Sequence, residues 1–365
     1  MRIVVDVAPL SHELTGVGNY IRGSLSGIVE ASAGADEVVA FAPASARGKR
    51  EIEAALDGID VERRLPVLPA AHAVRTAWSR AGAPSLERVV GPVDVFHFSD
   101  WMYPPQGGGI RSTMVHDLVP LHHPEWVHAR TRRMHGAKYR HAAEACDVVI
   151  VNSRFTGDDV VRTLGVDPAK VHVAYPGVDA GFSPEGERLD LDGRRYALTV
   201  ATLEPRKNLS RLVEAHARLD TDELSLLVVG AAGWGDQPEL DAPGIVRLGY
   251  TPREDLPRLY RGASVFVYPS LYEGFGMPVV EAMACGVPCV VSSHPSLDEA
   301  CGDAAVRADP DDAAAIAAAI ERALAEREEL AARGLEHARR FTWLENGRAH
   351  LAAWRAAAAG TSPST

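Results

Sequence analysis

Short apolar runs alternate with longer amphipathic stretches along almost the whole chain. Each run is followed by a turn and then by a stretch long enough for a helix. Parallel strands that are buried on both faces and joined by helices have this order, so the sequence predicts an α/β protein with parallel sheets wrapped in helices. The expected strands are 3–7, 38–41, 93–98, 113–115, 148–151, 171–174, 197–201, 226–229, 245–248, 265–268 and 289–291.

The segment 176–193 separates two such units, because proline, glycine and acidic residues replace the apolar pattern there. A chain of 365 residues is also long enough for two cores. The sequence therefore predicts one domain over 1–178, a linker over 179–194 and a second domain over 195–342. The final residues, 360–365, are predicted to form a disordered tail.

A further helix is expected near the end of the second domain. Asp309 would cap it and Pro310 would take its first position. Apolar residues then repeat every four positions, at Ile316, Ile320 and Leu324.

The charge and the cysteines argue against several classes of protein. The 49 acidic residues outnumber the 38 basic ones, which gives a net charge of -11 and disfavours binding to nucleic acid. The four cysteines form no C-x-x-C pair and suit a reducing compartment. The chain opens without a signal sequence and has no apolar run of the roughly 20 residues that a membrane span needs. We expect a cytoplasmic protein, with a peripheral position at the inner face of the membrane as the alternative.

In open parallel sheets, ligands bind beyond the carboxyl ends of the strands, so the loops there are the candidate sites. Gly16 and Gly18 follow the first strand and precede a helix, where small residues let the backbone approach a phosphate or a sugar. A tight turn is the alternative. The pair lacks the third glycine and the acidic residue of a dinucleotide-binding fingerprint, which argues against a nicotinamide-dependent oxidoreductase.

A histidine, His116, directly follows the expected strand 113–115. There it can hydrogen-bond a reacting sugar, and a purely structural role is the alternative. His122 and His123 lie nearby and would suit a metal site. No carboxylate or thiol ligand pattern completes such a site, so we expect no metal.

Two cations, Arg206 and Lys207, stand after the strand that ends at 201 and before a helix. A guanidinium fork, an ammonium group and the amides of a helix N-terminus together suit a diphosphate. Solvated loop cations are the alternative interpretation.

The loop after the expected strand 265–268 leads to two acidic residues, Glu273 and Glu281. Gly274 and Gly276 expose backbone amides between them. We expect the two carboxylates to come together and to bind polyol hydroxyls on either side of a diphosphate. The alternatives are a loop acid for Glu273 and a surface acid favoured by the helix dipole for Glu281.

Taken together, these loops resemble family 4 of the retaining nucleotide-sugar glycosyltransferases, with Glu273 and Glu281 matching the E-x7-E region. The resemblance covers nearly the whole chain and implies the GT-B architecture, in which two Rossmann-like, doubly wound domains face each other across a cleft. It also implies that a helix over 343–359 crosses back to the N-terminal domain. The motifs that carry it are GVGNY, HDLVPLHHPEW, VNSRFT, YPGVD, TLEPRKNL, LGYTPREDLPRLYRGA, EGFGMPVVEAMACGVP and FTWLENG.

The resemblance implies a role for each candidate residue of the second domain. Arg206 and Lys207 would bind the donor diphosphate, and Glu281 would bind the ribose hydroxyls. Glu273 would hold the transferred sugar. The backbone of the following loop would hold the same sugar, through Phe275, Gly276 and Met277.

For the first domain the resemblance implies the acceptor side. His116 would contact the transferred sugar, and Gly16 and Gly18 would lie near donor and acceptor. The reaction implied is transfer of a hexose, with retained anomeric configuration, from a nucleoside diphosphate sugar to a hydroxyl group. Neither a metal nor another cofactor is implied.

Bacterial mannosyltransferases of O-antigen and related polysaccharide assembly are the members that the chain resembles most. GDP-mannose is therefore the first donor we expect, and a glycan, a lipid-linked sugar or another cell-envelope precursor is the expected acceptor. UDP-glucose or UDP-N-acetylglucosamine with a small-molecule acceptor stays open, as does a non-catalytic nucleotide-sugar-binding protein. The letters of a metal-binding D-x-D motif occur at 190–192, but no expected strand precedes them.

The stretch 127–141 carries basic residues and no acidic one. A contact with anionic lipid, or with a phosphate-bearing acceptor, is one interpretation, and an ordinary solvated helix face is the other. The cations are Arg130, Arg132, Arg133, Lys138 and Arg140.

Overall fold

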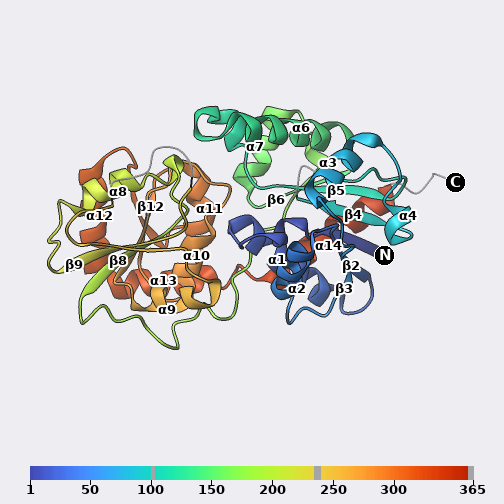
Figure 1. The fold of residues 1–365 in the computed structure, drawn as a ribbon. Coiled ribbons are helices and arrows are strands. Elements are labelled where there is room, and N and C mark those ends of the chain that lie inside the picture. The colour runs from blue at the N-terminus through green and yellow to red at the C-terminus, as the bar shows by residue number, and fades with distance from the viewer. Residues whose placement is uncertain (100–102, 234–239, 361–365) are drawn as a thin grey trace. The chain divides into compact units, whose positions relative to one another are not determined.

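The computed structural model describes residues 1–99, 103–233 and 240–360 (Figure 1). Its contacts divide the chain into two compact units. The first comprises Met1–Leu118, Arg130–Gly177 and the C-terminal segment from Thr342 on. The second comprises Val119–Ala129 and Val178–Phe341, so the segment 179–194, expected as a linker, is part of it.

The first unit contains a seven-stranded sheet with the strand order β3-β2-β1-β4-β5-β6-β7, and all its neighbouring strands are parallel. Because β1 pairs with both β2 and β4, the strand order reverses there, which is where ligands bind in such sheets. The strands are β1 (Arg2–Asp6), β2 (Glu37–Phe41), β3 (Glu62–Arg64), β4 (Val95–Phe98), β5 (Ile110–Val115), β6 (Val148–Val151) and β7 (Val171–Val173).

Helices surround this sheet, and Gly16 and Gly18 lie in the first turn of one of them, α1, rather than before it. The polar segment that follows β1 starts with a 3-10 turn, Ala8–Ser11, which delays the start of the helix. The main helices are α1 (Gly16–Ser32), α2 (Ala46–Ala55), α3 (Ala71–Ala81), α4 (Glu87–Val90), α6 (Ala129–Ala145), α7 (Arg154–Leu164) and α14 (Trp343–Gly360).

The C-terminal helix α14 belongs to the first unit and packs against α1. The two helices approach so closely that a Cβ on Gly27 of α1 would lie 1.8 Å from the backbone oxygen of Trp343. Asn346 of α14 donates its side-chain amide to the backbone oxygens of Ala174 (3.2 Å) and Tyr175 (2.7 Å). Gly360, expected in a disordered tail, is the last residue of this helix, and 361–365 lie outside the described residues.

Two buried histidines lie where α14 covers the sheet. Trp354 of α14 donates to the Ser112 hydroxyl (2.8 Å), which also contacts Nδ1 of His97 (2.9 Å). The His97 ring meets the His350 ring edge to face at 5.3 Å. Burial lowers the pKa of His350 from 6.5 to about 4 and lowers the pKa of His97 well below its usual value. Both imidazoles are therefore neutral at pH 7.

We expect the free energy of unfolding to fall as the pH drops from 7 to 4. Below pH 6.5 the unfolded chain protonates His350 while the folded chain does not until about pH 4. At 1.36 kcal/mol per pKa unit, this difference costs about 3 kcal/mol. Urea titrations at several pH values should show it. His350→Gln should reduce the pH dependence, while His97 and His116 keep their share of it. The exposed control His72→Gln should leave the slope unchanged; equal slopes in both variants would contradict the assignment.

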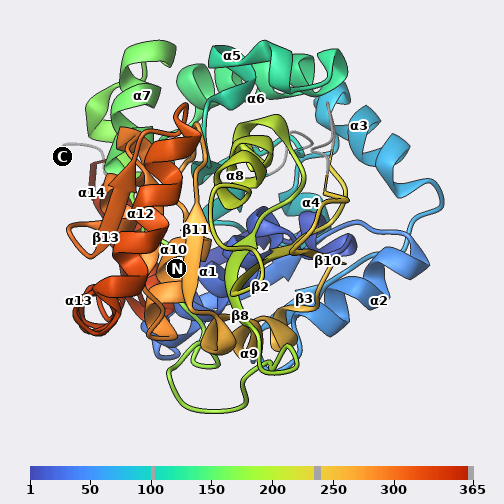
Figure 2. The same ribbon diagram turned by 90° about the vertical axis from the view of Figure 1, so that its left-hand side faces the viewer.

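The second unit contains a six-stranded parallel sheet with the order β10-β9-β8-β11-β12-β13. Helices α8 and α12 pack on its apolar core, and Figure 2 shows both beside the strands. The strands are β8 (Arg195–Val200), β9 (Leu224–Val229), β10 (Ile245–Gly249), β11 (Val265–Tyr268), β12 (Cys289–Ser292) and β13 (Ala305–Ala308). The helices are α8 (Leu209–His216), α9 (Leu256–Gly262), α10 (Met277–Ala284), α11 (Asp298–Cys301), α12 (Ala313–Ala325) and α13 (Arg327–Ala338).

The start of α12 differs from the sequence-based expectation. Its cap is Asp312, whose carboxylate accepts from the amides of Ala314 (2.8 Å) and Ala315 (3.2 Å). Asp309, the expected cap, instead accepts from the amide of Asp311 in a turn. Asp312 lies three residues later, directly before the apolar repeat, and it caps the helix in place of Asp309.

Across the described ranges, 1–99, 103–233 and 240–360, no helix is both long and apolar enough to cross a bilayer.

Candidate functional site

Two candidate loops of the second unit meet because the strands before them are neighbours. β8 and β11 pair in parallel, so the segments after their carboxyl ends lie at the same edge of the sheet. Arg206 and Lys207 lie in a 3-10 turn, Pro205–Lys207, between β8 and α8. The amide of Leu271, in the loop after β11, donates to the backbone oxygen of Arg206 (2.8 Å) and fastens the two loops together.

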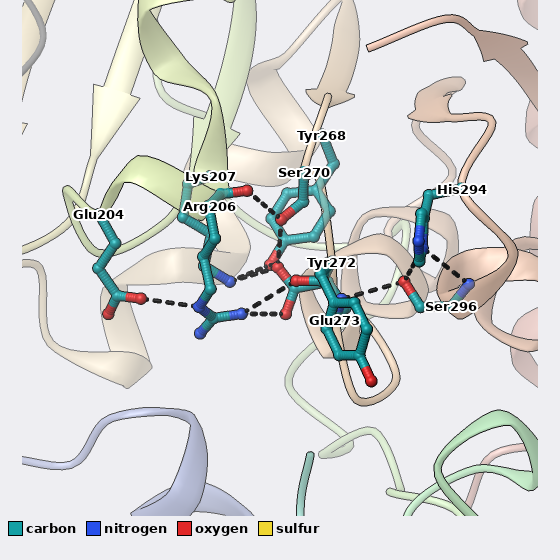
Figure 3. Close-up of polar contacts among 9 residues, drawn as sticks. All are labelled: Glu204, Arg206, Lys207, Tyr268, Ser270, Tyr272, Glu273, His294 and Ser296. Carbon is teal, nitrogen blue, oxygen red and sulfur yellow. Dashed lines mark hydrogen bonds and ion pairs between the residues drawn. The ribbon is translucent and has the colours of Figure 1, made fainter. Parts of the chain in front are cut away.

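The carboxylate of Glu273 lies at the centre of this site and accepts four hydrogen bonds (Figure 3). One oxygen, Oε1, accepts from Lys207 Nζ (2.5 Å), from the Ser270 hydroxyl (2.5 Å) and from the Tyr268 hydroxyl (3.0 Å). The other, Oε2, accepts from Arg206 Nη1 (2.7 Å). Glu273 is buried, and all four of these hydrogen bonds come from side chains of the protein.

The electrostatics keep this carboxylate charged. Burial alone would raise the pKa of Glu273, but the charges of Arg206 and Lys207 outweigh it and lower the pKa from 4.5 to about 2. Burial lowers the pKa of Lys207, and the charge of Arg206 lowers it further. Glu273 is consequently an anion at neutral pH.

A second acid, Glu204, balances the cluster. Its carboxylate accepts from Arg206 Nε at 2.8 Å, so two buried carboxylates face two cations. The side chains of Arg206 and Lys207 are 19% and 8% exposed, so the alternative of solvated loop cations is wrong. The alternative of an ordinary loop acid for Glu273 is wrong for the same reason.

Glu281 lies in α10 with a different set of partners. Its Oε1 accepts from Arg253 Nη1 (2.8 Å) and its Oε2 from the Tyr260 hydroxyl (3.1 Å). The residue is buried, so it is not the surface acid that the helix dipole alone would predict. Glu273 and Glu281 share no hydrogen-bond partner within the described part of the chain; each belongs to its own network.

The loop between these acids is fixed by its backbone. Gly276, with a φ of 106°, precedes α10, and a Cβ there would lie 2.6 Å from the Leu297 side chain, so glycine is required. Phe275 is buried and meets the Phe341 ring edge to face at 5.2 Å. Met277 is the first residue of α10. The three residues expected to hold a sugar through their backbone therefore lie in a packed loop and at the start of α10.

Five residues of these networks were missed by sequence reasoning. One of them is Tyr260 of α9, and nothing in the sequence connects it with Glu281. Glu204 and Tyr268 directly flank segments that had been selected, so the strand-end rule could have found them. Ser270 lies two residues after the end of β11. Arg253 follows β10 in a loop of mixed charge, and nothing in the sequence connects it with Glu281.

The first unit contains a cavity of about 990 Å³ beyond the carboxyl ends of β1 and β5. His116 and Gly18 line it, together with Arg75, Lys138 and Tyr139, whereas Gly16 does not. Nε2 of His116 is buried and has no hydrogen-bond partner among the described residues. Burial, with the charges of Lys138 and His135, lowers the pKa of His116 to about 3, so this imidazole is neutral at pH 7.

The basic stretch 127–141 forms most of α6, and it presents four cations rather than five. Lys138 is 4% exposed and donates to the backbone oxygen of Ser99 (2.5 Å), so it belongs to the interior. The exposed cations are Arg130, Arg132, Arg133 and Arg140.

Two sequence patterns suggest a metal site, the histidine pair His122 and His123 and the D-x-D letters at 190–192. Residues of both patterns contact neighbouring residues of the chain. His123 stacks on Trp126 at 3.8 Å and pairs with Glu125 at 3.2 Å. Asp190, the first residue of the D-x-D letters, accepts from the amide of Gly193 (2.7 Å) in a turn. Over the residues that the structure describes, no group of three or more His, Cys, Asp or Glu is placed to hold a metal ion.

Comparison with known proteins was made at the level of families, sequences and structures. The model "Glycosyl transferases group 1" matches residues 186–341, and "Glycosyltransferase Family 4" matches 16–182. An O-antigen chain mannosyltransferase B of Escherichia coli is 31% identical over 94% of this chain and 96% of its own length. A D-inositol 3-phosphate glycosyltransferase of Salinispora tropica is 34% identical over 55% of this chain and 49% of its own.

Solved structures share the fold at low sequence identity. A sucrose-phosphate synthase from Thermosynechococcus elongatus superimposes with a TM-score of 0.72 at 18% identity, covering 99% of this chain and 100% of that one. Anabaena Alr3699/HepE, in complex with UDP-glucose, gives a TM-score of 0.71 at 16% identity, covering 98% and 100%. Both comparisons support the same two-sheet architecture.

Proposed function

Since the chain belongs to glycosyltransferase family 4, the group 1 glycosyl transferases, and is a GT-B glycosyltransferase, we propose that it moves a hexose from a nucleoside diphosphate sugar to a hydroxyl acceptor with retained configuration. The observation that carries this proposal is the buried cluster of Arg206, Lys207 and Glu273. Membership of this family argues against the two alternative interpretations, a nicotinamide-dependent oxidoreductase and a non-catalytic nucleotide-sugar-binding protein.

In the proposed reaction, Arg206 and Lys207 donate to the leaving diphosphate. The bond from the anomeric carbon to this group breaks as the acceptor oxygen bonds to that carbon, and the hydroxyl proton passes to the leaving phosphate. Two largely buried cations stabilise the negative charge that grows on the diphosphate oxygens without reorganising. Glu281 binds the ribose hydroxyls. Glu273 holds the transferred sugar, together with the backbone of Phe275, Gly276 and Met277.

We propose mannose as the transferred sugar and GDP-mannose as the donor. The full-length similarity to an O-antigen mannosyltransferase supports this choice. A second candidate has UDP-glucose or UDP-N-acetylglucosamine as the donor and a small molecule as the acceptor. The similarity to a D-inositol 3-phosphate glycosyltransferase supports that acceptor class. Thermal-shift titration with GDP, UDP, ADP and dTDP, followed by hydrolysis of the matching sugar donor, tests both. Stabilisation by none of the four would contradict a donor site.

The acceptor side is proposed to be the cavity of the first unit. Its neutral His116 can accept or donate a hydrogen bond through the unpartnered Nε2, which suits a sugar hydroxyl. Gly18 lines the same cavity, and Gly16 lies two residues before it in the first turn of α1. A glycan, a lipid-linked sugar or another cell-envelope precursor is the acceptor class proposed here.

Transfer is expected to survive the removal of divalent cations. Arg206 and Lys207 already provide two positive charges for the diphosphate, so the reaction needs no metal to neutralise the leaving group. Initial rates of donor hydrolysis should be equal with and without excess EDTA. Loss of the rate in EDTA, restored by magnesium or manganese, would contradict this mechanism.

We further propose a cytoplasmic enzyme that contacts the inner face of the membrane through α6. Its four exposed arginines face solvent without an acidic residue in the stretch 127–141, and each cation near an anionic bilayer is worth about 1 kcal/mol. Reversing Arg132 and Arg133 to Glu should abolish flotation with phosphatidylglycerol vesicles while donor hydrolysis stays intact. Reversing Arg322 and Arg339, exposed cations elsewhere, should leave flotation unchanged. Absence of flotation in the parent would refute the contact.

A further inference from the structure

Arg253, which follows β10, is held between two carboxylates from distant parts of the second unit. Its Nε donates to Asp179 Oδ2 (2.6 Å) and its Nη1 donates to Glu281 Oε1 (2.8 Å). The guanidinium lies over the ring of Phe182 at 4.8 Å. The side chains of Arg253 and Glu281 are 16% and 5% exposed, so their ion pair is largely shielded from water, whereas Asp179 is 28% exposed.

The carboxylate of Glu281 is held in one orientation but can accept further hydrogen bonds. Each carboxylate oxygen accepts one hydrogen bond, from Arg253 on one side and from the Tyr260 hydroxyl on the other. An ionised carboxylate can accept about four, so each oxygen keeps a lone pair for a ligand hydroxyl. Glu273 differs, because its Oε1 alone already accepts three.

Arg253 also connects Glu281 to the segment where the chain enters the second unit. That stretch begins at Val178, whose amide donates to the backbone oxygen of Phe341 (3.1 Å), the last residue before the chain leaves the unit. Asp179 is the next residue. Because Arg253 binds both Asp179 and Glu281, it holds the Glu281 carboxylate against this segment. The segment is itself held in place by the hydrogen bond between Val178 and Phe341.

We propose that Arg253 is a positioning residue of the donor site, which holds the Glu281 carboxylate in the orientation that accepts the hydroxyls of the nucleotide. This inference rests on the proposed donor site and extends it by a residue that touches Glu281 rather than the substrate. Without Arg253, Glu281 would be a buried carboxylate with one neutral donor, free to rotate or to take up a proton.

The chain offers a matched control in Arg261 of α9. Its guanidinium donates to the backbone oxygens of Gly181, Ser183 and Glu187, each at 2.8 Å, so it supports the same segment as the Asp179–Arg253 pair. It makes no hydrogen bond to Glu281. A change of nucleotide affinity on loss of Arg261 therefore measures the effect of the segment alone. A change on loss of Arg253 measures the effect of the segment and of the Glu281 carboxylate together.

The test compares Arg253→Met, Arg253→Lys, Arg261→Met and Glu281→Gln by calorimetric titration with whichever of GDP, UDP, ADP and dTDP binds the parent. Thermal unfolding confirms folding of each variant. A charge-assisted hydrogen bond is worth about tenfold or more in affinity, so Arg253→Met should weaken binding by about tenfold and raise the donor KM with little change in kcat. Arg253→Lys should recover part of the loss, and Arg261→Met should bind as the parent does.

The double variant Arg253→Met with Glu281→Gln should bind no worse than Glu281→Gln alone, because the cation acts through the carboxylate. Three results overturn the proposal. They are parent-like binding by Arg253→Met, an equal loss in Arg261→Met, and a loss in Arg253→Met while Glu281→Gln binds normally. If Glu281→Gln binds poorly and Arg253→Met does not, only this inference fails. If both bind normally, the assignment of the ribose to Glu281 fails as well.

Discussion

Replacing Lys207 with Met is expected to lower kcat/KM for donor hydrolysis by roughly 100- to 1000-fold. The ammonium of Lys207 is buried between Tyr268 and Glu273 and lies at the edge of the sheet where the proposed diphosphate binds. A preorganised cation in such a site stabilises charge that develops as the diphosphate leaves, which solvent could do only after reorganising. Part of the loss should appear as weaker nucleotide binding, because the diphosphate is charged before the reaction as well.

Initial rates and calorimetric titration of the nucleoside diphosphate provide the measurement. Arg211→Met is the matched control: it removes a cation of α8 whose side chain is 37% exposed and pairs with Glu214 on the same helix. That variant should retain the parent rate and affinity. Parent-like kcat/KM in Lys207→Met, with the fold intact, would show that Lys207 only neutralises Glu273.

The fold could be predicted wherever burial leaves a continuous apolar run. The strands β6 and β11 match their predicted ranges, because all their residues are buried. β3 could not be predicted, since its residues Glu62, Arg63 and Arg64 are charged and exposed and show no apolar pattern. β13 was missed because two of its four residues are partly exposed, which weakens the apolar signal.

The site could be predicted as a set of loops but not as a network. The rule that ligands bind at the carboxyl ends of parallel strands selected Arg206, Lys207 and Glu273, which the structure brings into direct contact. Their pairing joins residues more than sixty positions apart, and its geometry depends on β8 lying beside β11. Local sequence patterns carry no information about that adjacency.

The partly wrong interpretation of the basic stretch has a similar cause. Lys138 has the same charge as its neighbours on α6, yet it points into the first unit and donates to Ser99. A count of charges along a helix does not show which side faces the interior when the helix has a weak apolar pattern. The remaining four arginines are the part of the stretch that can meet a partner.

Glu273→Gln is expected to separate turnover from nucleotide binding. The substitution keeps the shape of the side chain but removes the charge that balances Arg206 and Lys207. Breaking a buried ion pair costs about 3 to 5 kcal/mol, so the variant should unfold at lower denaturant concentration. Turnover should fall by roughly 100-fold or more, because the variant loses an anion at the place where we propose that the transferred sugar binds.

Nucleotide affinity should not fall with turnover. In the parent the diphosphate must share both cations with Glu273; in Glu273→Gln they are free of that competition, so the nucleoside diphosphate should bind as tightly as before or more tightly. Denaturant titration, calorimetry and initial rates on one donor give the three quantities. Glu214→Gln, the same change at an exposed ion pair, should alter none of them. If affinity falls in Glu273→Gln by the same factor as kcat, Glu273 organises the diphosphate site and does not act on the transferred sugar, because a contact that grows only in the transition state leaves ground-state binding unchanged.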